Sequence, residues 1–312
     1  MIPLVPAEPY LLGQRNATLA QHLGYDGGER LLIINADDFG LTPAVNRSIA
    51  ELFELGLISS TTLMVTGRAY DEAVRLVKDG SIPDCGLHLT LTSSLPDSPA
   101  TPILPAAEIP SLVDRNGHFY LNRDDFFANA RPEEAEREAI AQIERVLSMG
   151  VNLTHLDSHE GTLQLLPEFA EVYIRLGARF RLPMRMGSRM LVRELGHEDD
   201  WISHAHDLGL HFPDNFVYVP IDAFASFEEK LSYKLKLIDA LPAGVTELYF
   251  HPARATWLSE LDGVHVDDGA GLIWQVRSWD YRILTSPELR QRVDSGAFRL
   301  ISFRPLRELV RT

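Results

Sequence analysis

One short stretch, residues 31–40, constrains the fold of this chain more than any other. It reads Leu-Leu-Ile-Ile-Asn-Ala-Asp-Asp-Phe-Gly. Its four apolar residues, two of them β-branched, predict a strand that is buried on both faces. Asp37 and Asp38 follow this strand, and Thr42 and Pro43 then suit the cap and first turn of a helix. The two acids are therefore expected where a strand ends and a helix begins, which in α/β folds is the edge that carries active sites.

The aspartate pair has two interpretations. Adjacent residues on an extended strand point to opposite sides, so Asp37 and Asp38 are expected to have different roles in a site. A lone pair of aspartates is also typical of a helix cap followed by a solvated turn, because Asp favours both positions. The residues further along the chain decide between the two.

Composition limits the class of protein. The chain has 312 residues, of which 45% are hydrophobic and 23% charged, and this suits one large α/β domain or two small ones. The formal net charge of −15 argues against a nucleic-acid partner, which needs a basic surface. Cys85 is the only cysteine, so any metal must be held by His, Asp and Glu.

The N-terminal residues do not resemble a targeting segment. Residues 1–12 are apolar, but three prolines interrupt them and no basic leader precedes them. No apolar run reaches the length of a membrane span. We therefore expect a cytoplasmic enzyme without a membrane partner, with residues 1–29 as an extension and residues 30–312 as a single domain.

Strand and helix patterns alternate along the rest of the chain. Further strands are predicted at 61–65, 85–91, 153–157, 183–186, 216–219, 246–250 and 298–302. Helical spacing predicts helices from about residue 45 to Gly56, at 69–78, at 132–149, from Pro167 to just before Gly177, at 227–241 and at 286–295. Residues 92–125 carry no clear element, and a loop that long is typical of a functional lid or of disorder. The repeated β-then-α order predicts one α/β domain that resembles a TIM barrel, with long loops at the active-site face.

Histidines fall at the predicted strand ends. His88 lies in the third strand, His155 and His159 flank the end of the fourth with Asp157 between them, and His251 follows the strand at 246–250. In a barrel these ends meet at one face. An Asp and two neutral imidazoles form a divalent-metal site with open positions, and such an ion suits hydrolysis. A second carboxylate can then take the proton from water, and a further His can protonate the leaving group.

Each histidine also has a structural interpretation. His88 could be a hydrogen-bonded residue on a strand, and His251 before Pro252 could simply end one. For His155 we favour a role in orienting its neighbours. The pair His204 and His206 has nothing that ties it to the sheet edge, so a metal site there is not expected.

Four motifs resemble a known family. They are Asn35–Gly40 (NADDFG), Gly86–Leu89 (GLHL), Thr154–His159 (THLDSH) and His251-Pro252. Together, in this order, they closely resemble the YdjC-like (ChbG-type) carbohydrate deacetylases, from about Arg30 to the C-terminus.

The resemblance implies a divalent-metal-dependent hydrolase on a distorted or incomplete (β/α) barrel, which removes an N-acetyl group from an amino sugar or short acetylated oligosaccharide. It makes Asp38, His88 and His159 the metal ligands, Asp37 the general base and His251 the general acid. Zn²⁺ suits this ligand set best, and Mg²⁺, Mn²⁺ or Co²⁺ would also fit an open site with waters. The family tends toward dimers. The resemblance gives four further residues supporting or substrate-binding roles: His155, Asp157, Arg277 and Asp280. Arg277 and Asp280 form an R-x-x-[ED] pattern of the family, in which Arg277 is expected to steady Asp37 or the substrate.

The chain also departs from the family. Many members follow Asp-Ser-His with more histidines and a Leu-Pro, whereas residues 160–167 here read EGTLQLLP. This departure affects the substrate more than the metal. Two alternatives remain, a metal hydrolase for another acyl amide or ester and a sugar-binding protein without catalysis. The second is disfavoured because binding alone would need neither Asp37 nor His251.

Overall fold

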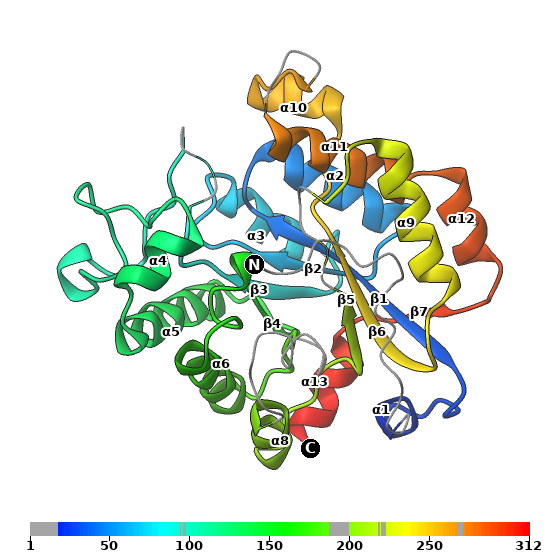
Figure 1. Cartoon of the computed structure of the whole chain (residues 1–312), viewed down its shortest axis with the longest axis horizontal. Coiled ribbons are helices and arrows are strands. Elements are labelled where there is room, and N and C mark those ends of the chain that lie inside the picture. Colours follow the sequence, from blue (N-terminus) through cyan, green and yellow to red (C-terminus); the bar gives the residue numbers. More distant parts are fainter. Residues whose placement is uncertain are drawn as a thin grey trace.

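The sheet is a parallel half-barrel surrounded by helices (Figure 1). The computed structural model describes residues 18–93, 95, 98–186, 200–217, 219, 223–266 and 271–312. Within these residues seven strands pair in the order β4-β3-β2-β1-β6-β5, with β7 also on β1. The strands are β1 (Arg30–Phe39), β2 (Ser60–Leu63), β3 (Cys85–Leu89), β4 (Leu156–Ser158), β5 (Asn215–Val217), β6 (Gly244–Phe250) and β7 (Arg299–Leu300). The chain is thus an α/β single domain with an incomplete barrel, as the sequence predicts.

Strand β1 is the centre of the sheet. It pairs with β6 from Arg30 to Ala36, with β7 at its start and with β2 at its end. Every residue of β1 after the first is buried. The expectation that the stretch around residues 31–34 is covered on both faces is therefore confirmed, and the residues that follow it lie deep in the half-barrel.

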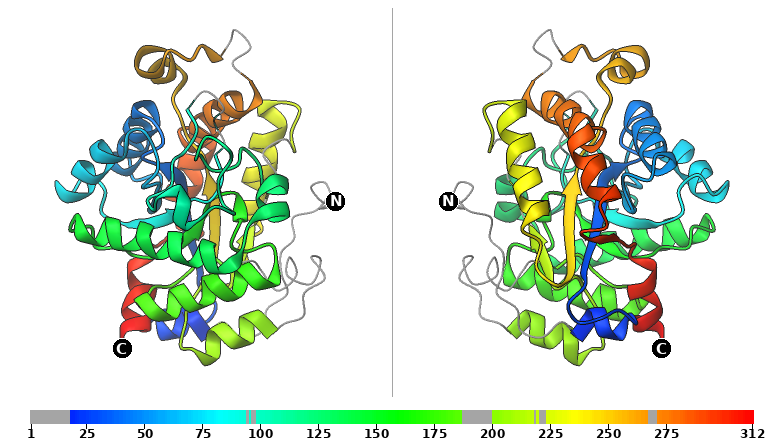
Figure 2. Two further views of the ribbon diagram at one scale, coloured as in Figure 1. Left: turned by 90° about the vertical axis from the view of Figure 1, so that its left-hand side faces the viewer. Right: turned by 90° about the vertical axis from the view of Figure 1, so that its right-hand side faces the viewer.

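Helices cover the outside of the sheet (Figures 1 and 2). In the described residues they are α1 (Thr18–His22), α2 (Pro43–Glu54), α3 (Tyr70–Lys78), α4 (Arg123–Asn129), α5 (Pro132–Ser148), α6 (Pro167–Phe180), α8 (Asp200–Asp207), α9 (Phe227–Asp239), α10 (Ala255–Asp262), α11 (Leu272–Leu284), α12 (Pro287–Asp294) and α13 (Arg304–Arg311). The Thr42 hydroxyl accepts a hydrogen bond from the Val45 amide at 3.3 Å and so caps α2, as predicted. None of the helices in these ranges is both long and apolar enough to cross a membrane.

Three predictions about elements differ clearly from the structure, whereas the other predicted strands differ from β2, β3, β5, β6 and β7 by only one or two residues at an end. Residues 183–186 form only an isolated bridge, between Met184 and Leu156, and β4 begins at Leu156 rather than Leu153. Helix α6 continues through Gly177 to Phe180. A Cβ at Gly177 would lie 2.3 Å from the Met184 sulfur, so this glycine lets the helix approach the core instead of ending it.

The described parts of the long segment 92–125 are hydrogen-bonded to α5. The buried Glu138 carboxylate accepts hydrogen bonds from the amides of Ile103 at 2.8 Å and Leu104 at 2.9 Å. Glu134 accepts one from the Ser111 amide at 2.8 Å. Acids on the buried face of a helix thus satisfy the backbone of a segment that has little regular structure of its own.

Two helices close the amino ends of the strands. Helices α1 and α13 lie at the same end of the molecule (Figure 2), where Leu19 packs in one cluster with Ile33, Phe303 and Leu306. Part of the segment expected to be an extension, residues 18–22, therefore covers this end. The opposite, carboxyl edge carries the candidate site.

Candidate metal centre

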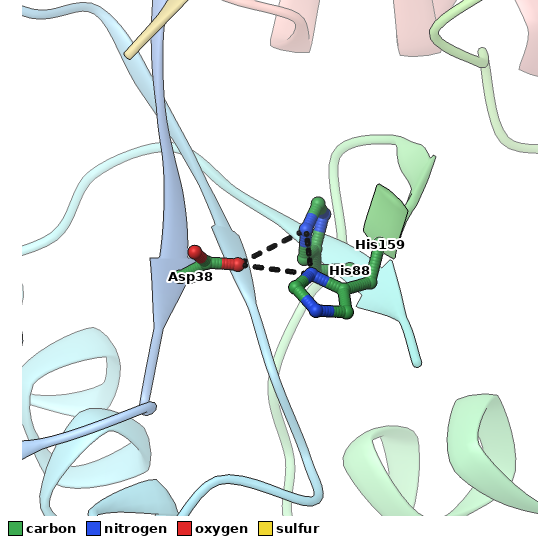
Figure 3. A group of neighbouring side chains, drawn as sticks. All are labelled: Asp38, His88 and His159. Atoms are coloured by element: carbon green, nitrogen blue, oxygen red, sulfur yellow. Dashed lines mark hydrogen bonds and ion pairs between the residues drawn. The ribbon is translucent and has the colours of Figure 1, made fainter. Parts of the chain in front are cut away.

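Three side chains converge at the carboxyl edge (Figure 3). Asp38 Oδ1 lies 3.2 Å from His88 Nε2 and 3.2 Å from His159 Nδ1. The two ring nitrogens are 3.1 Å apart. All three side chains are buried. The residues come from β1, β3 and the end of β4, which are far apart in the sequence.

An irregularity in β1 turns Asp38 toward the histidines. The pairing of β1 with β2 shifts register between Ala36 and Phe39, and Asp38 has a φ of 68°. This left-handed conformation is uncommon outside glycine and is best tolerated by Asn and Asp. It breaks the regular alternation along the strand. Asp37 and Asp38 therefore both lie beside His88 and His251, and the expectation that they point to opposite sides is wrong.

The three donors fit a divalent ion. An ion bound about 2.0–2.2 Å from each of three ligands places those ligands about 3 Å apart, as the donors lie here. Asp38 Oδ1 is buried and has no hydrogen-bond partner of ordinary geometry, so a cation would satisfy it. One carboxylate and two imidazoles also leave coordination positions open.

Electrostatics favour a charged Asp38. Burial raises the pKa of its carboxyl, but Arg277, His159 and His88 outweigh that effect and hold the pKa well below its usual value. The Arg277 guanidinium is 2.5 Å from Asp38 Oδ2, whereas Oδ1 is the oxygen that faces His88 and His159. Asp38 is therefore fixed by an arginine on one oxygen and presents the other to a cation.

Asp157 lies behind His88. Its Oδ2 is 2.7 Å from His88 Nδ1, and its Oδ1 accepts a hydrogen bond from the Ser158 amide at 2.6 Å. Burial lowers the pKa of His88, but the Asp157 and Asp38 carboxylates raise it to about 10 in the metal-free protein. A proton on Nδ1 donated to Asp157 leaves the lone pair of Nε2 directed at the centre.

Asp37 is held by Arg185, a residue that the sequence analysis did not single out. Arg185 Nη1 and Nη2 donate to the two oxygens of Asp37 at 2.7 and 2.8 Å, and Asn35 donates to Oδ1 at 2.7 Å. Arg185 Nε also donates to Glu247 at 2.8 Å. Burial raises the pKa of Glu247 to about 8 despite this arginine. No local motif marks Arg185; only its place in a predicted strand run could have drawn attention to it.

His251 lies at the open side of the centre. Its Nε2 is 3.8 Å from Asp37 Oδ2 and 4.0 Å from Asp38 Oδ2, and its side chain is 21% exposed. Burial lowers its pKa from the usual value. Its backbone amide donates to Asp280 Oδ2 at 2.9 Å, and Lys230 lies 2.6 Å from Asp280 Oδ1. Lys230, on the buried face of α9, is a second residue that the sequence analysis missed.

Two of the predicted supporting residues have other neighbours than expected. Arg277 contacts Asp38, whereas the sequence pattern placed it with Asp37 or the substrate. His155 stacks on Phe303 with ring centroids 3.7 Å apart, and its Nδ1 is 3.0 Å from the Thr154 hydroxyl. It thus lies toward the amino end of the sheet.

A pocket of about 330 Å³ lies at the same edge of the sheet. It is formed by residues that follow β1, β2 and β3: Leu41, Met64, Thr66, Gly67, Arg68, Thr92, Ser93, Leu95 and Ser98–Thr101. Its apolar part, Leu41, Met64 and Leu95, packs against Trp274. The ring of Trp274 is 5.7 Å from the Arg277 guanidinium, so the pocket is a neighbour of the centre.

A parallel half-barrel with a buried Asp-His-His set at its carboxyl edge defines a class of α/β proteins that can hold a divalent ion. The sequence profile of the YdjC-like protein family matches residues 31–295, and the chain belongs to this family.

Relatives and one solved structure are similar over nearly their whole lengths. The carbohydrate deacetylase of Brevibacillus brevis is 32% identical over 88% of this chain and 99% of its own. The carbohydrate deacetylase of Geobacillus stearothermophilus is 32% identical over 90% of this chain and 99% of its own. A crystal structure from Enterococcus faecalis V583, of a protein proposed to cleave cellobiose phosphate, has a TM-score of 0.71 and 30% identity over 89% of this chain and 99% of that one.

Proposed function

We propose that this protein is a divalent-metal-dependent hydrolase that removes the N-acetyl group from an amino sugar or a short acetylated oligosaccharide. The observation that carries the proposal is the buried set of Asp38, His88 and His159, whose donor atoms lie within 3.2 Å of one another beside Asp37 and His251. The relatives named carbohydrate deacetylases support the substrate class.

In this proposal Asp38, His88 and His159 hold one divalent ion, and Zn²⁺ suits one carboxylate and two imidazoles. When bound, such an ion supplies a Lewis acid that polarises the amide carbonyl and acidifies water. Arg277 fixes the outer oxygen of Asp38, and Asp157 fixes the tautomer of His88. These contacts set the direction of the ligand atoms before any substrate arrives.

Asp37 and His251 move the protons. Asp37 accepts the proton of the attacking water at Oδ2, the oxygen that lies 3.8 Å from His251. Arg185 and Asn35 hold this carboxylate in place. His251 takes this proton over from Asp37 Oδ2 and gives it to the amine nitrogen as the amide C–N bond breaks, so the products are acetate and a free amine and both side chains return to their starting state. The Asp280 carboxylate accepts a hydrogen bond from the His251 backbone amide and so fixes the backbone of His251.

The pocket at the carboxyl edge is proposed to take part of the sugar. Its lining combines apolar side chains with the hydroxyls of Thr66, Thr92 and Ser93, a mixture that suits a polar ring with an apolar face. Its volume of about 330 Å³ is at the small end of ligand pockets. We therefore propose a mono- or disaccharide rather than a long polymer.

An acetate-release screen tests this function. The purified protein is incubated with N-acetylated mono- and oligosaccharides, with O-acetyl esters and with acyl amides that are not sugars, with and without a chelator. We expect acetate from N-acetyl sugars only, lost with the chelator and restored by added divalent metal. Release of the acyl group from the esters or the other amides alone would mean that the protein hydrolyses that class of substrate instead. Binding of sugars without any release of acetate would indicate a sugar-binding protein.

A further inference from the structure

A second set of ligand atoms lies beside the candidate metal centre. Asp37, His88 and Asp157 each offer one such atom, and these atoms lie within 4.8 Å of one another. All three side chains are buried. Two carboxylates and an imidazole are a usual ligand set for a divalent ion, and hydrolases with paired ions about 3.5–4 Å apart are common. His88 belongs to both sets, so with its Nε2 directed at the first centre a second ion would be held by the carboxylates of Asp37 and Asp157.

A guanidinium lies inside this second set. Arg185 Nη1 is 2.7 Å from Asp37 Oδ2 and 2.6 Å from Asp157 Oδ2. Its Nε is 2.8 Å from Glu247 Oε1, so a single arginine pairs with three carboxylates from β1, β4 and β6. Arg185 is only 4% exposed. A cation at hydrogen-bond distance from both aspartates leaves no space for a metal ion between them.

The first set is arranged differently. Arg277 contacts Asp38 through Oδ2, whereas Oδ1 faces His88 and His159. No arginine or lysine in the described part of the chain is paired with Oδ1. Of the two neighbouring sets, one is therefore open to a metal ion, and the other contains a protein cation.

We propose that Arg185 occupies the position of a second metal ion and thereby keeps the centre mononuclear. Its positive charge satisfies Asp37 and Asp157, which otherwise would attract a divalent ion into the interior. It also keeps Asp37 from becoming a metal ligand. The inference rests on the proposed metal site, but it concerns the number of ions and not the reaction.

Removal of the guanidinium should open the second set. In Arg185→Gln the carboxylates of Asp37 and Asp157 lose their common cationic partner and Glu247 loses a hydrogen-bond donor, and buried charges without a partner are costly. A divalent ion supplied in solution would replace the missing charge. Arg185→Lys is the matched control, because it keeps one positive charge at the same position.

Manganese is the probe, because it is counted by elemental analysis and detected by electron paramagnetic resonance. The wild type, Arg185→Lys and Arg185→Gln are purified in the presence of Mn²⁺, and loosely bound metal is removed. We expect one Mn²⁺ per chain in the wild type and in Arg185→Lys, with the spectrum of an isolated ion. We expect a second Mn²⁺ in Arg185→Gln, with the spectrum of a magnetically coupled pair.

Several results would overturn the inference. A coupled pair in the wild type would mean that Arg185 does not fill the second position. A folded Arg185→Gln variant with a single isolated ion would mean that the second set does not attract a metal ion. Failure of Arg185→Gln to fold with Mn²⁺ present, while Arg185→Lys folds, would mean the same. A wild type that binds no Mn²⁺ would remove the proposed centre as well, so the two failures are distinguishable without any activity measurement.

Discussion

Asp37 and Asp38 are adjacent in the chain, yet their carboxylates pair with different arginines. Arg185 donates to both oxygens of Asp37 at 2.7 and 2.8 Å, whereas Arg277 lies 2.5 Å from one oxygen of Asp38 and leaves the other directed at two histidines. The left-handed backbone at Asp38 makes this possible, since it turns both side chains toward one centre. Their different partners, and not a strand alternation, distinguish the two roles proposed for them.

This difference predicts opposite effects of two conservative substitutions. Asp37→Asn should keep the metal and lower the rate by about 10²–10⁴-fold, the usual contribution of a general base. Asp38→Asn should lose metal affinity first and regain part of its activity at high metal concentration; asparagine is suitable because it tolerates the positive φ. Metal content and acetate release of both variants are measured together. Loss of metal from Asp37→Asn but not from Asp38→Asn would reverse the assignment.

His159 is predicted to be a metal ligand, so His159→Ala should bind a divalent ion more than about 100-fold more weakly, a larger loss than that for an outer partner of a ligand. The side chain is buried against Asp38 and His88, and its removal leaves two donors. His204→Ala on α8 is the control, because that histidine is 46% exposed and lies against Glu171 instead. Equal metal content in the two variants, by elemental analysis, would exclude His159 from the centre.

Lys230 is predicted to act through Asp280 on His251. Lys230→Met leaves the buried Asp280 carboxylate without its 2.6 Å partner, which should cost about 3–5 kcal/mol of stability. If the His251 backbone then shifts by about 1 Å, the rate should fall by about 10²-fold. Metal content should not change, and the pH profile of the rate should shift with the environment of His251. Lys236→Met, at an exposed position of the same helix, is the control. An equal loss of rate in both variants would contradict the proposed action of Lys230 through Asp280 on His251.

Glu247 predicts a pH dependence of stability. Burial raises its pKa from the usual 4.5 to about 8 in the folded chain. A group whose pKa is raised on folding contributes stability that is complete below the unfolded pKa and is lost as the pH rises through the folded one. The wild type should therefore lose stability between about pH 5 and 8 through this group. Glu247→Gln should show a smaller decrease over that range in thermal unfolding, with Glu260→Gln on the exposed side of α10 as the control. Parallel curves for all three proteins would contradict the assignment.

Much of the architecture was predictable because its signals are local. The apolar run before Asp37, the Thr42 cap and three of the strand-end histidines, His88, His159 and His251, identify positions at the carboxyl edge of a parallel sheet. The motifs that carry the family resemblance are local as well, and the family is confirmed by the profile match.

The residues that sequence reasoning missed are isolated cations. Arg185 and Lys230 belong to no motif, and each meets its carboxylate partners only after the sheet and α9 have assembled. The predicted end of α6 is wrong for a similar reason, since Gly177 is required by a close approach to Met184 and not by a helix terminus. Non-local packing decides such positions, and no short pattern in the chain reports it.

The position of the metal, in a crystal grown with Mn²⁺ and measured at the manganese absorption edge, tests the proposed centre most directly. We expect one anomalous peak, bounded by Asp38 Oδ1, His88 Nε2 and His159 Nδ1, with Arg185 still paired with Asp37. A single peak between Asp37 and Asp157, or no peak among these side chains, would contradict the proposed centre.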